Sequence, residues 1–397
     1  MKGKLTVLMI TAFVDMLGLA MIIPLLPFYA TKLGASATVV GILIAAFSIA
    51  QLASAPLWGR FSDRYGRRPA LLVGLLVSAV AYVIFAYAST LWLLLLSRVV
   101  QGLGGGTIGV VQAYVADASD PKDRAKSLGW LSAATSFGAV VGPAIGSALI
   151  HWGRHAPGIA SAIFCVLISI FAGVYLRESR EESLGSGEHG ILAETGSGAV
   201  WSVISRPKEP AQRLIWIYAI AIGAFYGTVP TLPLILAHRL PITEANVGFF
   251  VMYLGGMGVF VRAGLLGRMI EWLGEARLTR LGLVLLAAGL ALIAAVHSYA
   301  TLLVALTLMP LGTAFVFPCV TAMLSRVVPT RNRGLYMGVQ HTFGGVSRVL
   351  FPLAAGVAMD HLGFGFPFVI AGVLVLSTLL LTTSMEDYAV SRAPSMT

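Results

Sequence analysis

Two ionisable side chains within long apolar runs are the strongest candidates for chemistry. Asp15 lies in an apolar run that continues to about Tyr29, and Arg98 lies in the middle of a run that begins near residue 91. A charged group at such a position is costly, so it is a functional hypothesis by default. Burial raises the pKa of a carboxylate, and a nearby arginine lowers it. An Asp–Arg pair in a hydrated cavity can therefore be tuned to exchange protons. We predict Asp15 as the proton carrier and Arg98 as its charge partner.

The elements that carry these two residues place them at similar depth. With helix starts near residues 5 and 91 and a rise of about 1.5 Å per residue, Asp15 and Arg98 agree in depth to within about 5 Å. After Arg98, Gln101, Gly105 and Gln112 fall within an arc of about 60°, which predicts one polar stripe facing a cavity. A structural alternative stays open for each charge: backbone or water satisfies Asp15, and carbonyls of a neighbouring helix hold Arg98.

No other constellation in the sequence indicates catalysis. There is no HExxH motif, no Ser–His pairing at a recognisable spacing, no acidic cluster in an apolar run and no phosphate-binding Gly-x4-Gly-Lys loop. Cys165 and Cys319 both lie in apolar runs, far from any CxxC pattern. We therefore expect no enzyme activity, no metal and no cofactor. A membrane sensor or an intramembrane enzyme is the rival class, and measured flux against turnover separates it from a transporter.

Composition assigns the chain to the membrane. Of its 397 residues, 57% are hydrophobic and 11% are charged, against roughly 25% charged in soluble domains. The net charge of +10 comes from basic residues that punctuate apolar runs, which is typical of topology signals and gives no reason to expect nucleic-acid binding. The chain is predicted to be a polytopic α-helical protein of the lipid bilayer, without a cleaved leader and acting as a monomer.

The apolar runs and their breaks predict twelve spans. They begin near residues 5, 37, 69, 91, 124, 157, 211, 245, 277, 299, 332 and 364. Of the 27 Lys and Arg residues, only Lys32, Arg154 and Arg239 fall in loops on one side, three lie within spans, and all others fall on the termini and the loops of the opposite side. By the positive-inside rule both termini are cytoplasmic.

A hydrophilic stretch divides the spans six and six. We predict an N-terminal six-helix bundle at residues 1–177, a cytoplasmic linker at 178–210 and a C-terminal six-helix bundle at 211–397. The halves repeat, since a Pro-x-x-Pro at 24–27 recurs at 230–233. Internal duplication of this kind fits two pseudo-symmetric bundles facing one another across a cavity.

The loop at residues 59–69 is dense in charge and punctuated by glycine, so it belongs at an interface between spans. Its pattern Gly-x-x-x-Asp-Arg-x-Gly-Arg-Arg resembles the loop between helices two and three of the major facilitator superfamily, and the resemblance extends over nearly the whole chain. It implies a cytoplasmic latch in which Asp63 faces the start of the eleventh helix and Arg67 pairs with Asp117. Solvated topology charges are the alternative. The gating residues it implies are Gly59, Asp63, Arg64, Gly66, Arg67, Arg68 and Asp117.

Two further stretches carry the same resemblance. Gly138, Gly142, Pro143 and Gly146 resemble the superfamily's antiporter motif, with Ser147 where a final Gly is usual. Such a glycine face suits sliding against a partner helix, and we expect the partner to be residues 255–258 in the eighth span; static packing is the alternative. The first span, with Asp15, resembles that of proton-coupled tetracycline and multidrug exporters.

Polar and aromatic residues on cavity-facing positions are the candidate substrate contacts. Arg262 and Arg348 bring positive charge to the C-terminal half, which has no deep carboxylate, and this favours a neutral, zwitterionic or anionic substrate. Either arginine also has a structural alternative in helix packing. The candidate contacts are Gln51, Gln101, Gln112, Tyr226, His341 and Arg348.

Together these features predict a secondary active transporter. We expect an all-α major facilitator fold of twelve transmembrane helices in the bacterial cytoplasmic membrane. Its function would be proton-coupled antiport, exporting a small amphipathic or drug-like compound by alternating access. The alternative is an exporter of a sugar, organic anion or lysolipid with the same fold.

Overall fold

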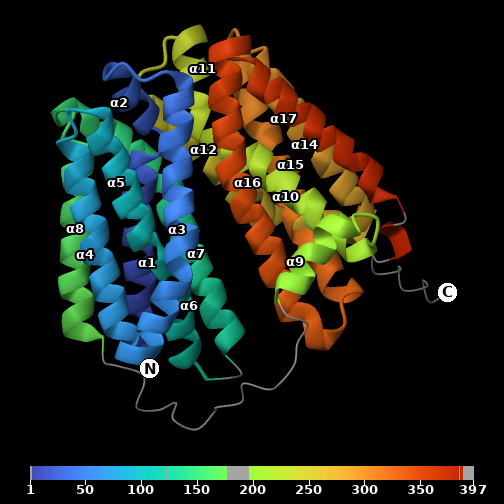
Figure 1. The fold of residues 1–397 in the computed structure, drawn as a ribbon, viewed down its shortest axis with the longest axis horizontal. Coiled ribbons are helices and arrows are strands. Elements are labelled where there is room, and N and C mark those ends of the chain that lie inside the picture. Colours follow the sequence, from blue (N-terminus) through green and yellow to red (C-terminus); the bar gives the residue numbers. More distant parts are fainter. Residues whose placement is uncertain (1, 121–122, 177–195, 384, 388–397) are drawn as a thin grey trace. The chain divides into compact units, whose positions relative to one another are not determined.

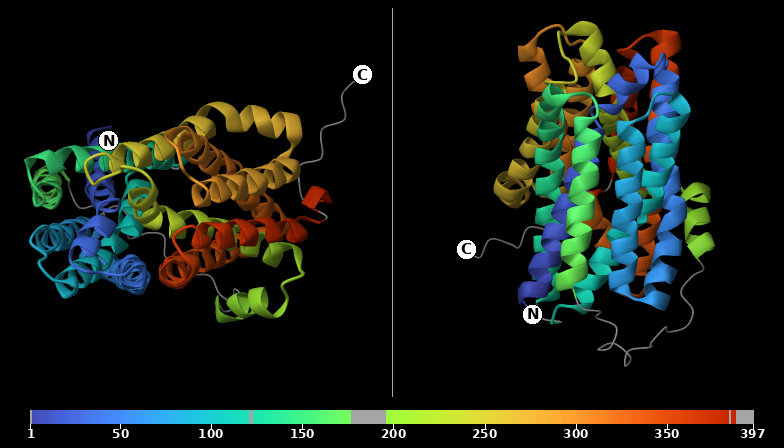
Figure 2. Two further views of the ribbon diagram at one scale, coloured as in Figure 1. Left: turned by 90° about the horizontal axis from the view of Figure 1, so that it is seen from above. Right: turned by 90° about the vertical axis from the view of Figure 1, so that its left-hand side faces the viewer.

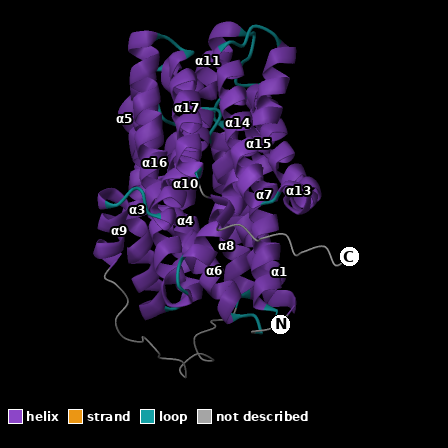
Figure 3. Ribbon diagram, turned by 90° about the vertical axis from the view of Figure 1, so that its right-hand side faces the viewer, coloured by secondary structure: helices purple, strands orange, loops and turns teal. Residues whose placement is uncertain are grey.

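The computed structural model describes residues 2–120, 123–176, 196–383 and 385–387. Within these ranges the chain is helical, with short connecting loops and no strand (Figure 3). Among the same residues, eleven helices are long and apolar enough to cross a membrane, and the twelfth predicted span is the shorter apolar segment Phe366–Thr382. The all-α, multi-span fold predicted from the sequence is confirmed.

The chain forms two compact units. The first comprises Met1–His189 with Pro241–Tyr253, and the second comprises Gly190–Leu240 with Leu254–Thr397. The helices that begin in the first 176 residues are α1 (Lys2–Ile22), α2 (Leu26–Lys32), α3 (Ala37–Tyr65), α4 (Arg67–Ala86), α5 (Leu91–Gly104), α6 (Ile108–Asp117), α7 (Arg124–Leu149) and α8 (Ala156–Tyr175) (Figure 1).

The first of the later helices, α9, lies within the predicted linker. They are α9 (Gly196–Ser205), α10 (Pro210–Thr228), α11 (Leu232–Arg239), α12 (Val247–Phe260), α13 (Leu266–Leu273), α14 (Glu275–Ala294), α15 (Tyr299–Val327), α16 (Arg333–Leu362) and α17 (Phe366–Ser377). Of the predicted linker, residues 178–195 lie outside the described residues. Helix α9 lies alongside α16 (Figure 2), and the Trp216 indole of α10 donates to the carbonyl of Val203 in α9 at 3.0 Å.

Several spans are broken at positions that the sequence explains. A turn containing Pro24 separates α1 from α2, and the 3-10 turn Val229–Thr231, which contains Pro230, separates α10 from α11. Proline has no N–H and clashes with the carbonyl one turn back, so it favours a break in a helix. The 3-10 turn Gly105–Thr107, which contains two glycines and no proline, separates α5 from α6. The break in the seventh span therefore repeats the break in the first.

The interior of the first unit fixes the helices that carry Asp15. Leu8 of α1, Leu75 of α4, Tyr114 of α6, Leu131 of α7 and Ala172 of α8 belong to one buried cluster, and each is at most 4% exposed. In lipid these side chains are not removed from water on packing, so the cluster stabilises the bundle through close van der Waals contact between helices. The cluster holds α1, α6 and α7 together, and their polar residues meet beside it.

Candidate functional site

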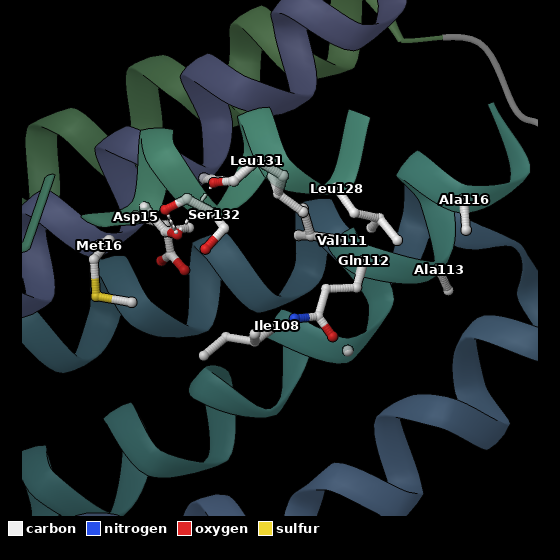
Figure 4. A pocket seen from close by; sticks show the side chains of 13 residues that line it. Asp15, Met16, Ile108, Val111, Gln112, Ala113, Ala116, Leu128, Leu131 and Ser132 are labelled. Carbon is white, nitrogen blue, oxygen red and sulfur yellow. Dashed lines mark hydrogen bonds between the residues drawn. The ribbon is translucent and has the colours of Figure 1, made fainter. Parts of the chain in front are cut away.

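Asp15 lines a cavity of about 610 Å³ between α1, α6 and α7 of the first unit. Figure 4 shows its carboxylate pointing into the cavity beside Ser132 of α7, with the Gln112 amide entering from α6. Thr135 completes the polar lining, although its hydroxyl donates to the carbonyls of Leu131 and Ser132 at 3.1 and 2.9 Å. The rest of the wall is apolar and is formed by Ala12, Met16, Ile108, Gly109, Val111, Ala113, Ala116, Leu128 and Leu131.

The Asp15 carboxylate has no hydrogen bond or ion pair with any residue that the structure describes. The two hydroxyl residues near it, Ser132 and Thr135, were missed by the sequence analysis. The sequence contained a signal for them, because Thr135 and Ser132 precede Gly138 by about one and two turns of the same helix. The cavity thus offers one carboxylate, one amide and two hydroxyls within an apolar wall.

Arg98 and Gln101 lie in α5 and are not among the residues that line this cavity. Each is only 2% exposed, and the Arg98 guanidinium lies 5.3 Å from the centre of the Phe85 ring. Two of its nitrogens and both amide atoms of Gln101 have no hydrogen-bond partner among the described residues. No ion pair joins Arg98 to Asp15 in that part of the chain, so their pairing stays a prediction.

The polar stripe expected on one continuous helix is therefore wrong in its geometry. The 3-10 turn Gly105–Thr107 interrupts the helix, so Gln112 lines the cavity whereas Arg98 and Gln101 are buried away from it. Gln51 of α3 supports this turn, since its amide donates to the carbonyl of Gly105 at 3.2 Å. A substrate-binding role for Gln51 and Gln101 remains a prediction.

The candidate contacts of the second unit lie on α10 and α16. The Tyr226 ring is 44% exposed and stacks at 6.4 Å on Phe317. His341 is exposed and meets the Tyr218 ring edge-on at 6.2 Å. Arg348 is half-buried on the same helix as His341. Tyr218, which the sequence analysis did not single out, joins these groups.

The loop between α3 and α4 contains the predicted Arg67–Asp117 contact. Arg67 Nε lies 3.2 Å from an Asp117 oxygen, and its Nη1 lies 2.7 Å from Asp63 and 2.9 Å from Ser62 Oγ. Gly66 has a φ of 104°, in the region that residues with a Cβ rarely adopt. Arg67 thus joins the end of α3 to the end of α6, and the function of this network as a gate remains a prediction.

The other predicted members of the gating motif have separate contacts. Arg64 lies 5.3 Å from the centre of the Tyr65 ring, and Arg68 donates to the carbonyl of Gly173 in α8. Gly59 has open space where a Cβ would be. The Arg68 hydrogen bond thus ties the start of α4 to α8.

The glycines of the antiporter-like motif face α1. A Cβ on Gly142 would lie 2.8 Å from both the Ala20 Cβ and the Leu17 carbonyl oxygen, and Gly138 and Gly146 face the backbone of the same helix just as closely. We call this contact the glycine seam. It lets two helices approach at backbone distance, as small residues do in membrane proteins.

The predicted partner of these glycines, residues 255–258, is wrong. Helix α12 contacts α7 elsewhere: the Gly248 N–H donates to Ser147 Oγ at 2.9 Å, and this hydroxyl donates to the Glu244 carbonyl at 2.6 Å. A Cβ on Gly248 would collide with the carbonyl of Pro143. The sequence shows that one face of α7 lacks large side chains. It does not identify the partner of that face, because several helices could pack against it.

The family model of the Major Facilitator Superfamily matches residues 8–293 and 263–395. The chain belongs to the Major Facilitator Superfamily. It is therefore a multi-pass membrane transporter of small molecules. The described residues include no group of three or more His, Cys, Asp or Glu able to hold a metal ion.

Multidrug and tetracycline resistance proteins match this transporter along nearly its whole length. Multidrug resistance protein 2 of Bacillus subtilis (strain 168) is 30% identical over 393 residues, which cover 97% of this chain and 96% of the relative. Multidrug resistance protein 1 of the same organism is 29% identical, with 96% of each chain covered. Tetracycline resistance protein, class B, of Escherichia coli is 26% identical, with 91% and 90% covered.

Solved structures of this superfamily share the fold. A bacterial homologue of the human lysosomal transporter Spinster aligns with a TM-score of 0.77 at 12% identity and covers 98% of both chains. The human organic anion transporter aligns with a TM-score of 0.66 at 23% identity and covers 96% of this chain and 99% of the other. At these identities the likeness extends to the fold alone.

Proposed function

We propose that this transporter is a proton-coupled exporter of small amphipathic, drug-like compounds. The observation that carries the proposal is the position of Asp15, a carboxylate without a described hydrogen-bond partner in a cavity of about 610 Å³. This volume is within the range of sites for drug-sized molecules, which are mostly apolar with a few placed polar groups. The names of the relatives, multidrug and tetracycline resistance proteins, support the same substrate class.

In this proposal, Asp15 alternates between a neutral, protonated form and a charged, deprotonated form. The wall around it is largely apolar, so the two forms differ strongly in how well they suit a closed or a hydrated cavity. A ligand or proton shifts a conformational equilibrium only through such a differential interaction. Proton release and substrate release would then be coupled through access to the same cavity.

The proposed architecture is alternating access between an N-terminal bundle at 1–177 and a C-terminal bundle at 211–397. The distribution of Lys and Arg supports cytoplasmic termini in a bacterial cytoplasmic membrane. The Arg67–Asp117 and Arg67–Asp63 contacts support a role for this loop as a latch at that side.

The test is drug-dependent proton movement in proteoliposomes. Purified protein is reconstituted, a pH difference is imposed, and compounds from a growth-inhibition panel in an efflux-deficient bacterial host are added. Wild type is expected to move protons against each exported compound, and Asp15→Asn is expected to bind compounds but move no protons. Uphill export that is indifferent to the pH difference would overturn proton coupling, and absence of any export would overturn the transport of drug-like compounds.

A further inference from the structure

The second unit carries two arginines in the middle of its spans. Arg262 lies in the span Val247–Leu273 and Arg348 in the span Thr330–Leu362. Neither forms an ion pair with any carboxylate of the described residues. An uncompensated guanidinium at this depth is costly in lipid, and such residues face a hydrated cavity and mark a ligand pathway.

Both arginines lie near one tyrosine. Tyr218 is within electrostatic range of the guanidinium groups of Arg348 and Arg262, and its ring lies 6.2 Å from the ring of His341, which precedes Arg348 by seven residues on α16. Three different helical segments, α10, α16 and the turn after α12, thus direct polar groups to one region of the second unit. The charge gathered there is positive, and no described acidic side chain balances it.

An aromatic wall borders this region. The Tyr218 and Tyr226 rings lie 5.4 and 6.4 Å from the ring of Phe317, and Tyr226 remains 44% exposed. Aromatic faces at these spacings can stack a further flat ring. The region therefore combines cationic donors with a surface for an aromatic ligand body.

The backbone at Arg262 is itself unusual. Residues Val261–Leu265 form a π-helical turn between α12 and α13. Single π turns within α-helices insert an extra residue and occur frequently at functional sites. The turn changes the direction of the Arg262 side chain relative to an uninterrupted helix, and it is independent of the charge argument.

We propose that Arg348, Arg262 and the Tyr218 hydroxyl form an anion-binding subsite for the carboxylate of an amphipathic, aromatic substrate. The proposal deepens the proposed function, on which it rests, by naming the substrate class. Arginine suits this role because its planar fork donates two parallel hydrogen bonds to a carboxylate. The substrate's ring would lie against Tyr226 and Phe317.

The experiment compares 2-naphthoate with 2-naphthamide, which share ring and size but differ in charge at neutral pH. Binding is measured by calorimetry to the full-length protein in phosphatidylcholine nanodiscs, which lack anionic lipid. Wild type is expected to bind naphthoate at least about tenfold more tightly than naphthamide. Arg348→Ala and Arg262→Ala are each expected to lose most of this preference, whereas the matched control Arg268→Ala keeps it.

Two further variants separate the loss of the Arg348 charge from a loss of folding. Arg348→Gln keeps most of the side chain without its charge and should lose the preference, and Arg348→Lys should keep part of it, provided each elutes as a single species. No preference for naphthoate in wild type, including no binding of either probe, overturns the subsite, as does an Arg348→Gln protein with wild-type preference. An arginine-dependent preference supports it.

Failure of the subsite is distinguishable from failure of the proposed function. If wild type exports panel compounds against a pH difference but shows no naphthoate preference, the subsite is wrong and the transport proposal stands. If the arginine-dependent preference is present but no compound is exported, the subsite stands and the transport proposal is wrong.

Discussion

The two units differ in the charges that they place in the middle of their spans: the first has one acidic and one basic residue, and the second has two basic residues. In the first, Asp15 points into a cavity and Arg98 is buried against Phe85. In the second, Arg262 and Arg348 are without a described acidic partner. The units nevertheless share structural devices, so their difference lies in these charges in the middle of the spans.

One shared device is an arginine that ties the third span of a unit to its sixth. In the first unit, Arg68 at the start of α4 donates to the carbonyl of Gly173 near the end of α8. In the second, Arg280 near the start of α14 donates to the carbonyl of Thr382 at 2.9 Å and to Glu386 at 2.5 and 3.0 Å. Duplication has thus kept the scaffold similar while the mid-span charges differ.

The largest expected effect is the loss of export when the Asp15 carboxylate is removed. Asp15→Asn keeps the shape of the side chain but cannot release a proton, so pH-driven uphill export should fall to background while substrate binding persists. Substrate-induced proton movement in proteoliposomes is the measurement. Asp120→Asn, a loop carboxylate, is the control and should behave as wild type. Proton movement at the wild-type ratio by Asp15→Asn would place the proton site elsewhere, with His341 the next candidate.

The second prediction tests the glycine seam of the first unit against a glycine of the second. Gly142→Ala places a Cβ 2.8 Å from Ala20 and Leu17 and should destabilise the protein by about 1–3 kcal/mol, as overpacking does. Gly264→Ala, where nothing lies within 4 Å, is the matched control. Thermal unfolding in detergent measures both. Equal midpoints would mean that α1 and α7 separate easily and that the seam is not a tight contact.

The third prediction compares the two copies of the charged loop. Asp63 is paired with Arg67 at 2.7 Å, whereas its counterpart Glu271 has no ion pair among the described residues. Asp63→Asn should lower transport up to about fivefold, the effect of roughly 1 kcal/mol that an exposed pair contributes, with membrane insertion intact. Glu271→Gln should change transport little. Full transport by Asp63→Asn at normal expression would remove this loop as a latch.

The smallest expected effect concerns the ion pair between Arg280 and Glu386 at the end of the second unit. Hydrogen bonds from Arg280 hold the pKa of Glu386 below its ordinary value of 4.5. A carboxylate whose pKa is lower when folded stabilises the fold above the ordinary value and loses this contribution as the pH falls through the folded value. Glu386→Gln should lower the Tm at pH 7 by about 1–2 °C, and the gap to wild type should close below pH 4.5. A gap that is independent of pH would contradict the ion pair.

The positions of the membrane crossings follow from the sequence alone. Span length and apolar composition are local properties, and so is the loss of an N–H at Pro24 and Pro230. The Arg67–Asp117 contact was also predictable, because it rests on a loop pattern of narrow geometry whose resemblance to a known family is specific. The spans depend on local sequence and on the bilayer, which imposes the same limits on every span. The Arg67–Asp117 contact joins residues 50 positions apart, so its prediction rested on the resemblance alone.

Which side chains meet depends on how the helices pack. Helical periodicity predicts a face as long as the helix is continuous, and the turn at Gly105–Thr107 separated Gln112 from Arg98. A face also does not identify its partner, so the glycine seam met α1, and Ser132 rather than Arg98 came to lie beside Asp15. The reason is physical: in lipid, helices associate by close packing that many surfaces satisfy, so partner choice depends on the whole bundle and not on one helix.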